Sequence, residues 1–370
     1  MKILHSIYDD LANPWCGGGG ALRTWEICRR LADRHEVTLL SGRYPGAPEE
    51  EEREGVRILR VGCSRSYATS RFGFSVAASR LLARASFDLW VYGFSAFSPI
   101  LAPERLRRRA LLEFFHSMAG HATRKRPLAG VAAVFAENMT LRAYRDVIGI
   151  SPSVLSRVAE KRGTKGLHLV YTGVDAACFD VPISEQDYIL FFGRLDTYNK
   201  GIDLLLKAFA QARTADSGTR LIVAGRGTPE RQRELAAMGK ALGISDRLEI
   251  IGAVSDEQKG ELFGGALFTC MPSRFEGWGI AAIEAGAAGK AVVGTDIPGL
   301  ADAIRPDETG LLVPNESVDD LAVAMQRLID EPETRKRLGA AGRAWARQFT
   351  WDRIARDQEK VYEEVVGRRG

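Results

Sequence analysis

The first 40 residues contain the segments that decide the fold: ILHSI at residues 3–7, GGGG at 17–20 and VTLL at 37–40. The first and last are short apolar runs typical of buried strands, and the residues after the glycines have helical periodicity. A strand, a glycine turn, a helix and a second strand form a βαβ unit, in which two parallel strands are joined by a right-handed crossover. The start of the chain therefore predicts an open α/β domain.

The same pattern begins again in the second half, with a predicted strand at Tyr188–Phe192, a helix at 202–212 and a strand at 221–224. A chain of 370 residues also exceeds the roughly 250–300 residues at which one hydrophobic core stops growing. We therefore predict two Rossmann-like, doubly wound domains. Their predicted limits are residues 1–180 and 181–350, followed by an amphipathic C-terminal helix in 351–370. Further strands are predicted at 56–61, 89–92, 110–115, 248–251, 267–271 and 291–294, and the acidic run 49–52 is predicted to be a surface loop.

The composition is that of a globular protein, with 45% hydrophobic and 26% charged residues. No apolar run reaches the length of about 18 residues that a membrane-spanning helix needs. The N-terminal segment turns polar too early for a secretory signal. The five cysteines are scattered without a CxxC pair, which favours reduced, structural thiols. Together these features predict a cytoplasmic protein.

Charge is distributed unevenly along the chain. Residues 1–180 carry 26 Lys and Arg against 18 Asp and Glu, whereas the remainder carries 25 against 29. This excess favours an anionic partner, such as phosphate groups or the acidic inner face of a membrane, which the protein would contact peripherally. The densest basic clusters are Arg105 with 107–109, and 124–126; their other interpretation is a solvated helix face and an exposed loop. No zinc-finger spacing or RNA-binding aromatic motif accompanies them, which argues against nucleic acid.

Residues 272–285, PSRFEGWGIAAIEA, carry the features of a ligand site. They lead from a predicted strand into a helix of small residues, so the last amides of the loop lie at a helix N-terminus, where phosphate binds. Gly277 and Gly279 let the backbone approach a ligand closely. Glu276 precedes the turn and Glu284 lies within the helix, so they are not the paired carboxylates of a glycoside hydrolase. Carboxylates accept hydrogen bonds from sugar hydroxyls, and we expect Glu276 to suit a hexose and Glu284 a ribose.

The same segment resembles the E-x7-E motif of the retaining glycosyltransferases of family 4, which have the GT-B fold. Other segments resemble this family in the same order along nearly the whole chain: glycines 17–20, Phe115-His116, Gly173-Val174-Asp175, Gly193-Arg194, Lys200-Gly201, GLLVP at 310–314 and Phe349-Thr350-Trp351. The resemblance implies two domains that face a central cleft. The first would bind the acceptor, the second would bind a nucleotide-sugar, and the C-terminal helix would return to the first.

By this resemblance, Glu284 holds the ribose of the nucleotide and Glu276 the donor sugar, while Arg194 and Lys200 neutralise the diphosphate. Fixed cations stabilise the negative charge that develops on the leaving group. For Lys200 the alternative is an ordinary salt bridge with Asp196 or Asp203. The implied donor-binding residues are Gly19, Gly20, Arg194, Lys200, Glu276, Gly277, Trp278, Gly279, Ile280 and Glu284. The implied catalytic residues are His116, Arg194, Lys200 and Glu276.

In the first domain, His116 follows a predicted strand and matches a family histidine near the transferred sugar, where it would donate a hydrogen bond. The amides of Gly19 and Gly20 open a helix and can approach phosphate or acceptor. The GGGG run lacks the GxGxxG spacing, which disfavours a nicotinamide or flavin site. Neither a DxD motif nor a cluster with metal-ligand spacing occurs. We therefore predict no metal and no cofactor; the nucleotide-sugar is a substrate.

Together, the motifs and the family resemblance predict a retaining hexosyltransferase. It would move a sugar from a nucleotide-diphosphate sugar to an acceptor hydroxyl on a glycan, a lipid or a small molecule. Retention follows from the resemblance alone. Two alternatives stay open: a sugar-nucleotide epimerase of the same architecture, and a non-catalytic two-domain sugar-binding protein. The donor sugar, the nucleotide base and the acceptor are left open.

Overall fold

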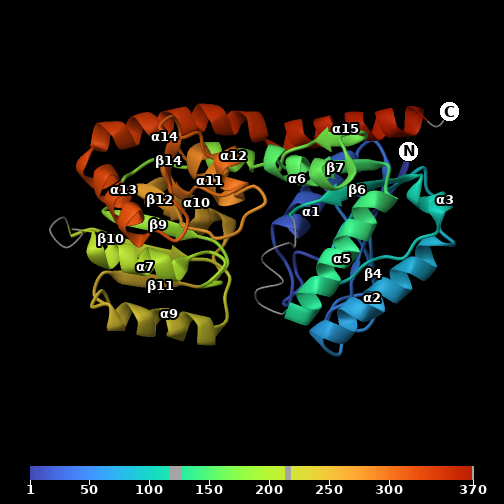
Figure 1. Ribbon diagram of the computed structural model, residues 1–370, viewed down its shortest axis with the longest axis horizontal. Coiled ribbons are helices and arrows are strands. Elements are labelled where there is room, and N and C mark those ends of the chain that lie inside the picture. Colours follow the sequence, from blue (N-terminus) through green and yellow to red (C-terminus); the bar gives the residue numbers. More distant parts are fainter. Residues whose placement is uncertain (117–126, 213–217, 369–370) are drawn as a thin grey trace. The chain divides into compact units, whose positions relative to one another are not determined.

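The computed structural model describes residues 1–116, 127–212 and 218–368, whose helices and strands are shown in Figure 1. The chain forms two compact units: unit 1 comprises Met1–Thr172 and Trp351–Gly370, and unit 2 comprises Gly173–Thr350. Unit 1 therefore ends earlier than residue 180, the boundary expected from the sequence. The reason is local, because the amide of Val174 already donates to the carbonyl of Phe349 in unit 2 at 2.7 Å.

The core of unit 1 is an eight-stranded sheet with the order β3-β4-β2-β1-β5-β6-β7-β8. All neighbouring strands are parallel except β3 and β4. The sheet confirms the predicted parallel α/β architecture. Its strands are β1 (Lys2–Ser6), β2 (Glu36–Gly42), β3 (Glu50–Arg53), β4 (Val56–Val61), β5 (Leu89–Gly93), β6 (Ala110–Phe114), β7 (Asp146–Gly149) and β8 (Leu167–Leu169).

The acidic run at 49–52 was wrongly predicted to be a loop, because most of it forms β3. This strand pairs antiparallel with β4 through a two-residue turn, 54–55, in which both residues have positive φ, the geometry that tight hairpins require. Glutamate is a poor strand former, but the strands place opposite charges together, and Arg57 Nε donates to the Glu50 carboxylate at 2.6 Å. The ion pairs compensate for the low strand propensity.

The described residues of unit 1 form six helices, and serine side chains cap the starts of α2 and α6. Ser66 forms a capping box with Thr69 at the start of α2, and the Ser151 hydroxyl caps α6 just before Pro152. In the described part of the chain no helix is both long and apolar enough to cross a lipid bilayer. The helices are α1 (Gly19–Leu31), α2 (Tyr67–Leu82), α3 (Glu104–Arg107), α5 (Pro127–Ala143), α6 (Pro152–Arg162) and α15 (Trp351–Gly367).

Unit 2 contains a six-stranded, wholly parallel sheet with the order β11-β10-β9-β12-β13-β14. Counted within the unit, this is the order 3-2-1-4-5-6 of the doubly wound nucleotide-binding fold. The predicted strands at Tyr188–Phe192 and Leu248–Ile251 are confirmed to the residue. The strands are β9 (Tyr188–Phe192), β10 (Arg220–Ala224), β11 (Leu248–Ile251), β12 (Phe268–Met271), β13 (Val292–Thr295) and β14 (Gly310–Val313).

The helices of unit 2 pack in pairs around this sheet: α7 contacts α13, and α11 contacts α14 (Figure 1). The second pair is held close by glycines, because a Cβ atom on Gly286 would lie 2.9 Å from the Gly342 carbonyl oxygen. The elements are η1 (Ala176–Phe179), α7 (Ile202–Gln211), α9 (Pro229–Ala241), α10 (Asp256–Gly265), α11 (Ile280–Ala287), α12 (Leu300–Ala303), α13 (Val318–Asp330), α14 (Pro332–Ala346) and η2 (Arg347–Phe349).

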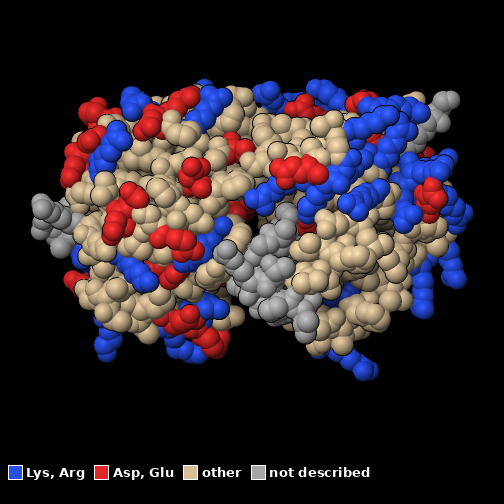
Figure 2. Space-filling model, viewed as in Figure 1, with Lys and Arg blue, Asp and Glu red and all other residues tan. Residues whose placement is uncertain are grey.

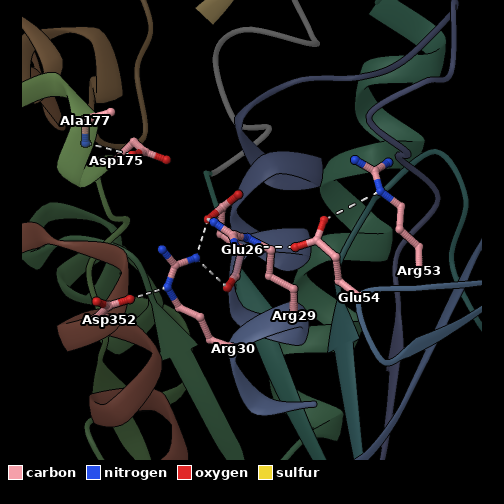
Figure 3. A network of polar contacts seen from close by, with 8 residues as sticks. All are labelled: Glu26, Arg29, Arg30, Arg53, Glu54, Asp175, Ala177 and Asp352. Atoms are coloured by element: carbon pink, nitrogen blue, oxygen red, sulfur yellow. Dashed lines mark hydrogen bonds and ion pairs between the residues drawn. The ribbon is translucent and has the colours of Figure 1, made fainter. Parts of the chain in front are cut away.

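The C-terminal helix α15 packs on α1 within unit 1. Ion pairs hold the outer edge of this contact, as Figure 3 shows: Arg30 Nε donates to Asp352 at 2.6 Å, and both Arg30 and Arg29 bind Glu26. Arg29 also reaches Glu54 of the β3–β4 turn at 3.5 Å. The pair that reaches α15 is exposed at Asp352, and such pairs contribute little free energy individually, so the docking of α15 must rest mainly on its buried face.

That buried face carries a polar network that joins α15 to the sheet. Arg23 of α1 donates to Glu113 of β6 at 2.6 Å and to Gln358 of α15 at 2.6 Å. Gln358 also donates to Glu113 and, at 2.5 Å, to the Tyr362 hydroxyl, which lies 3.2 Å from Nε2 of His5 on β1. All five side chains are at most 1% exposed. Because each member depends on another, α15 is part of the core of unit 1.

Acid is expected to destabilise unit 1 through His5. Burial, reinforced by Arg23 and opposed by Glu113, lowers the pKa of His5 from 6.5 to about 4. Between these values the unfolded chain binds more protons than the folded chain, so the free energy of unfolding falls as the pH drops from 6.5 to 4, by up to about 3 kcal/mol. Urea unfolding of the wild type and His5→Gln at several pH values measures this. A wild-type slope no steeper than that of His5→Gln would contradict it.

Candidate functional site

The site predicted in unit 2 lies where the strand order reverses. β9 stands between β10 and β12, and the connections that leave two such strands turn to opposite faces of a sheet, which opens a crevice at their carboxyl ends. Gly193 and Arg194 directly follow β9, and the loop 272–279 directly follows β12. Two segments nearly 80 residues apart in sequence are therefore brought to one edge of the sheet.

The loop after β12 leads into α11, and no side chain caps the N-terminus of this helix. Gly279 is the N-cap of α11, with φ of 83°. Gly299 packs against this loop. Any larger residue there would clash with it, because a Cβ atom on Gly299 would lie 2.6 Å from the carbonyl oxygen of Glu276. Amides at an uncapped helix N-terminus favour an anion, through both their N–H groups and the helix dipole. The predicted role of the amides at 277–280 is compatible with this geometry and stays a prediction.

The structure brings Lys200 and Glu276 together. The ammonium group of Lys200 forms an ion pair with Oε1 of Glu276, and the Ser273 hydroxyl donates to the same oxygen at 3.2 Å. The approach depends on Gly201, whose φ is 64° and where a Cβ atom would lie 1.8 Å from the Pro272 carbonyl oxygen. Both charged side chains keep some exposure, 19% and 13%. A ligand in the crevice would therefore meet a cation and a carboxylate side by side.

The alternative salt bridges considered for Lys200 are not formed. Asp203 instead receives two hydrogen bonds from Arg274, at 2.7 and 2.8 Å, and Asp196 accepts from the side chain of Asn199. Glu276 does not cap α11 either, because its described partners are Lys200 and Ser273 and the N-cap residue is Gly279.

Arg274 fixes the loop 272–279 to neighbouring segments of unit 2. Its guanidinium group is 7% exposed and forms ion pairs with Asp203 on α7 and with Glu316. It also donates to the Tyr198 carbonyl at 2.7 Å. The hydrogen bonds that Asp203 and Glu316 accept from Arg274 raise its pKa despite its burial. This clamp fixes the loops after β9 and β12 to each other. The sequence indicated no role for Arg274, because its partners are distant along the chain.

Glu284 is buried rather than solvent-facing, with 7% of its surface exposed. Its carboxylate lies 3.1 Å from the ammonium group of Lys259 on α10. Burial is the largest single influence on the pKa of Lys259 and would lower it, but the charge and hydrogen bond of Glu284, together with Cys178 and Asp256, outweigh it, so the net shift is upward and the lysine stays charged. Lys259 was not identified from the sequence, because the acidic residue close to it along the chain with which it pairs is Asp256, three residues earlier. Eight residues after Glu276, the site therefore holds a second pair of opposite charges, Glu284 with Lys259.

Arg194 and Trp278 differ in what they present to a ligand. Arg194 is exposed, and none of the described residues forms an ion pair with it. Trp278 is 2% exposed, and its ring packs edge-on against Phe349 at 5.1 Å between centroids. The indole therefore belongs to the core of unit 2, and only the backbone of Trp278 is available for the predicted donor contact. Ile280 is the first residue of α11.

The remaining predicted residues belong to unit 1. Gly19 and Gly20 open α1 after the N-cap Gly18, and His116 is exposed just after β6. The two segments approach each other, because a Cβ atom on Gly20 would contact the ring of Phe115 at 3.8 Å. Their participation in one site with the residues of unit 2 stays a prediction. Within the described ranges, no three His, Cys, Asp or Glu side chains converge as metal ligands.

Comparison with known proteins gives matches along most of the chain. The D-inositol 3-phosphate glycosyltransferase of Jonesia denitrificans is 33% identical over 217 residues, which are 53% of this chain and 51% of the relative. The chain thus spans about half the length of this relative. The GDP-mannose:cellobiosyl-diphosphopolyprenol alpha-mannosyltransferase of Komagataeibacter xylinus is 27% identical over 357 residues, which are 92% of this chain and 87% of the relative.

Among solved structures, the sucrose-phosphate synthase of Thermosynechococcus elongatus superposes with a TM-score of 0.83 at 22% identity, over 100% of both chains. This similarity confirms the predicted GT-B fold. Two family descriptions match consecutive parts of the sequence: Glycosyltransferase Family 4 matches residues 17–177, and Glycosyl transferases group 1 matches residues 179–345. The chain therefore belongs to the glycosyltransferases that combine a Glycosyltransferase Family 4 part with a following Glycosyl transferases group 1 part.

Proposed function

We propose that the protein is a retaining hexosyltransferase that moves a sugar from a nucleotide-diphosphate sugar to an acceptor hydroxyl. The observation that carries the proposal is the Lys200–Glu276 ion pair beside the uncapped start of α11, at the switch point of unit 2. Family membership supports a transfer reaction. The GDP-mannose in the name of the Komagataeibacter xylinus relative supports a nucleotide-sugar donor, while the base and the sugar of this chain's donor stay open.

The proposed donor extends across the crevice with its diphosphate at the start of α11. There Arg194 and Lys200 offset the charge of the phosphates, and the amides of 277–280 donate to their oxygens. Glu276 accepts hydrogen bonds from the sugar, and Glu284, held in place by Lys259, accepts them from the ribose. Negative charge grows on the diphosphate as the sugar departs, so fixed cations stabilise the transition state more than the ground state.

In the proposed step, the bond between the anomeric carbon and the diphosphate oxygen breaks, and its electron pair leaves with the phosphate. The acceptor oxygen forms the new bond on the same face, and its proton passes to the departing phosphate oxygen. Glu276 is engaged by Lys200 and Ser273, which favours a binding role for it over attack on the sugar. His116 is proposed to donate a hydrogen bond near the transferred sugar. We also propose that the reaction uses no metal or cofactor.

Donor binding is expected to depend on Glu284 and to survive without metal. In EDTA, one nucleoside diphosphate among UDP, GDP and ADP should raise the melting temperature, because a ligand that binds only the folded state stabilises it by about 2.7 kcal/mol at one hundred times its Kd. Glu284→Ala should reduce this shift, whereas Glu261→Ala, an exposed carboxylate of α10, should not. If no nucleotide shifts the melting temperature, or if all shifts vanish in EDTA, the proposal fails.

Turnover separates transfer from its two alternatives. A transferase releases free nucleoside diphosphate in proportion to glycosylated acceptor, an epimerase interconverts nucleotide-sugars without that release, and a binding protein does neither. Glu276→Gln should retain the nucleotide-induced stabilisation while losing transfer. Epimerised donor without released diphosphate would replace the proposal with the epimerase.

We further propose a peripheral contact between unit 1 and anionic lipid. Three exposed apolar residues of α5 are spaced by four positions and share one face of the helix: Val131, Phe135 and Met139. Figure 2 shows Lys and Arg side chains gathered over α3, the helix of the predicted basic cluster at 105–109. One of these, Arg108, pairs with the exposed Glu104 at 2.6 Å. The second predicted cluster, 124–126, lies outside the described residues.

Anionic vesicles at low salt should therefore co-sediment the protein, and salt should weaken the association because exposed charges are screened. Phe135→Ser should reduce binding, and Val323→Ser, an equally exposed apolar residue of unit 2, serves as the matched control. Absence of binding to anionic vesicles at low salt, or an equal effect of both variants, would end this proposal.

A further inference from the structure

Unit 1 contains a cavity that the proposed donor site does not use. It has a volume of about 240 Å³ and lies between α1, the loop after β1, and strands β2, β3 and β4. This is smaller than the roughly 300–1,000 Å³ typical of sites for drug-sized ligands, so it suits a single ring rather than a nucleotide. The lining residues on which the argument rests are Asp10, Thr24, Trp25, Tyr44, Arg53 and Arg60.

The first indication of a ligand is an unsatisfied hydroxyl group. Thr24 of α1 lines the cavity and is 2% exposed, yet its Oγ1 has no hydrogen-bond partner among the described residues. A buried hydroxyl without a partner loses its contacts with water and gains none in return. Such a group is expected to find a partner in whatever fills the cavity.

The walls combine aromatic rings with charges that already neutralise each other. Trp25 and Tyr44 are 6% and 8% exposed. The Arg53 guanidinium group lies 4.6 Å from the centre of the Trp25 ring. Nε of Arg60 donates to Asp10 at 2.9 Å, and its Nη2 donates to Glu51 at 3.1 Å. Because the carboxylates of Asp10 and Glu51 line the cavity together with Arg53 and Arg60, these four side chains offer an anionic ligand no net positive charge.

We propose that this cavity binds a neutral polyhydroxylated ring, a sugar or cyclitol unit. The ring would rest its apolar face on the aromatic side chains, exchange a hydrogen bond with the Thr24 hydroxyl, and use the remaining N–H groups and lone pairs of Arg53 and Asp10 for its other hydroxyls. The cavity belongs to unit 1 and the residues of the donor site belong to unit 2, so the interpretation of the bound ring as the acceptor rests on the proposed transferase function. The binding itself does not.

The test measures binding of defined polyols without donor. Saturation-transfer NMR with methyl α-D-mannopyranoside, methyl α-D-glucopyranoside and myo-inositol should show binding of at least one to the wild type. Thr24→Val should weaken that binding by roughly 5- to 10-fold, the effect of losing one hydrogen bond, and Thr24→Ser should retain most of it. Binding of a methyl glycoside indicates a sugar ring, and binding of myo-inositol indicates a cyclitol ring.

The matched control is Thr269→Val, which removes another buried hydroxyl that lacks a partner among the described residues, on β12 of unit 2; it should leave polyol binding unchanged. Since neither hydroxyl has a partner, neither variant should lower the melting temperature appreciably. Three outcomes overturn the proposal: no polyol binds, inorganic phosphate binds in place of the polyols, or Thr24→Val and the wild type bind equally. A nucleotide-induced stabilisation that persists beside any of these leaves the transferase proposal intact.

Discussion

Lys200→Met is expected to lower kcat about 10²- to 10³-fold, the loss typical of removing one preorganised group that stabilises developing negative charge. The ammonium group of Lys200 lies at the crevice, paired with Glu276 and 19% exposed. Methionine keeps the length and apolar stem of lysine but carries no charge. The nucleoside diphosphate should bind more weakly as well, but by less than kcat falls, because the charge on the phosphate is greatest in the transition state. Steady-state kinetics with a fixed acceptor measures both effects.

A matched variant and a double-mutant cycle make this result interpretable. Lys207→Met alters an exposed lysine on α7, the helix that begins two residues after Lys200. This variant should leave kcat unchanged. Removing Lys200 also leaves Glu276 without its cation, so the losses in Lys200→Met and Glu276→Gln should not add in the double variant. A Lys200→Met enzyme with kcat within about twofold of the wild type would show that the diphosphate is neutralised elsewhere.

Glu113→Ala is expected to destabilise unit 1 by about 3–5 kcal/mol, because it leaves Arg23 charged and buried without a counter-ion. Arg23 and Glu113 are 0% and 1% exposed, and Gln358 depends on both. Replacing both charges with apolar residues, as in Arg23→Met with Glu113→Leu, should cost less than Glu113→Ala alone, since no charge is then stranded.

Hydrogen exchange of the β1 and β6 amides reports this change for unit 1 separately, which matters because a chain of two units need not unfold in one transition. Glu104→Ala is the matched control: it removes an exposed ion pair with Arg108 and should change stability by no more than about 1 kcal/mol. A loss for Glu113→Ala as small as that of the control would show that Arg23 finds water or another partner.

The sequence predicted the fold well where a strand is apolar and bounded by glycine or polar residues. β4 and β9 are such strands, and both begin and end where predicted. β7 (DVIG) and β8 (LHL) were missed because each has only two apolar residues, too few for a strand pattern to register. β14 (GLLV) was identified only as part of a family motif and not as a strand. β3 was missed for another reason: its glutamates are poor strand formers, and it forms through pairing with arginines on β4, which a local pattern does not reveal.

For the candidate site, the sequence located the segments but not their partners. The loop at 272–279 and Arg194 were identified from motif and position, and the structure brings Lys200 to Glu276 as an ion pair across 76 residues of sequence. Lys259 and Arg274 were not identified. Each acts through partners that are far along the chain, Glu284 for Lys259 and Glu316 for Arg274, and only the folded sheet determines such pairings.

The return of α15 to unit 1 also determines when the protein can finish folding during synthesis. Unit 2 is contiguous in sequence, whereas unit 1 needs residues from both ends of the chain. The ribosome adds Gln358 and Tyr362 only after unit 2, so the buried charges of Arg23 and Glu113 lack their partner from α15 while all of unit 2 is made. We therefore expect unit 2 to complete its fold before unit 1, although most of unit 1 precedes it in the chain, the reverse of the usual N-terminal-first order of domain folding.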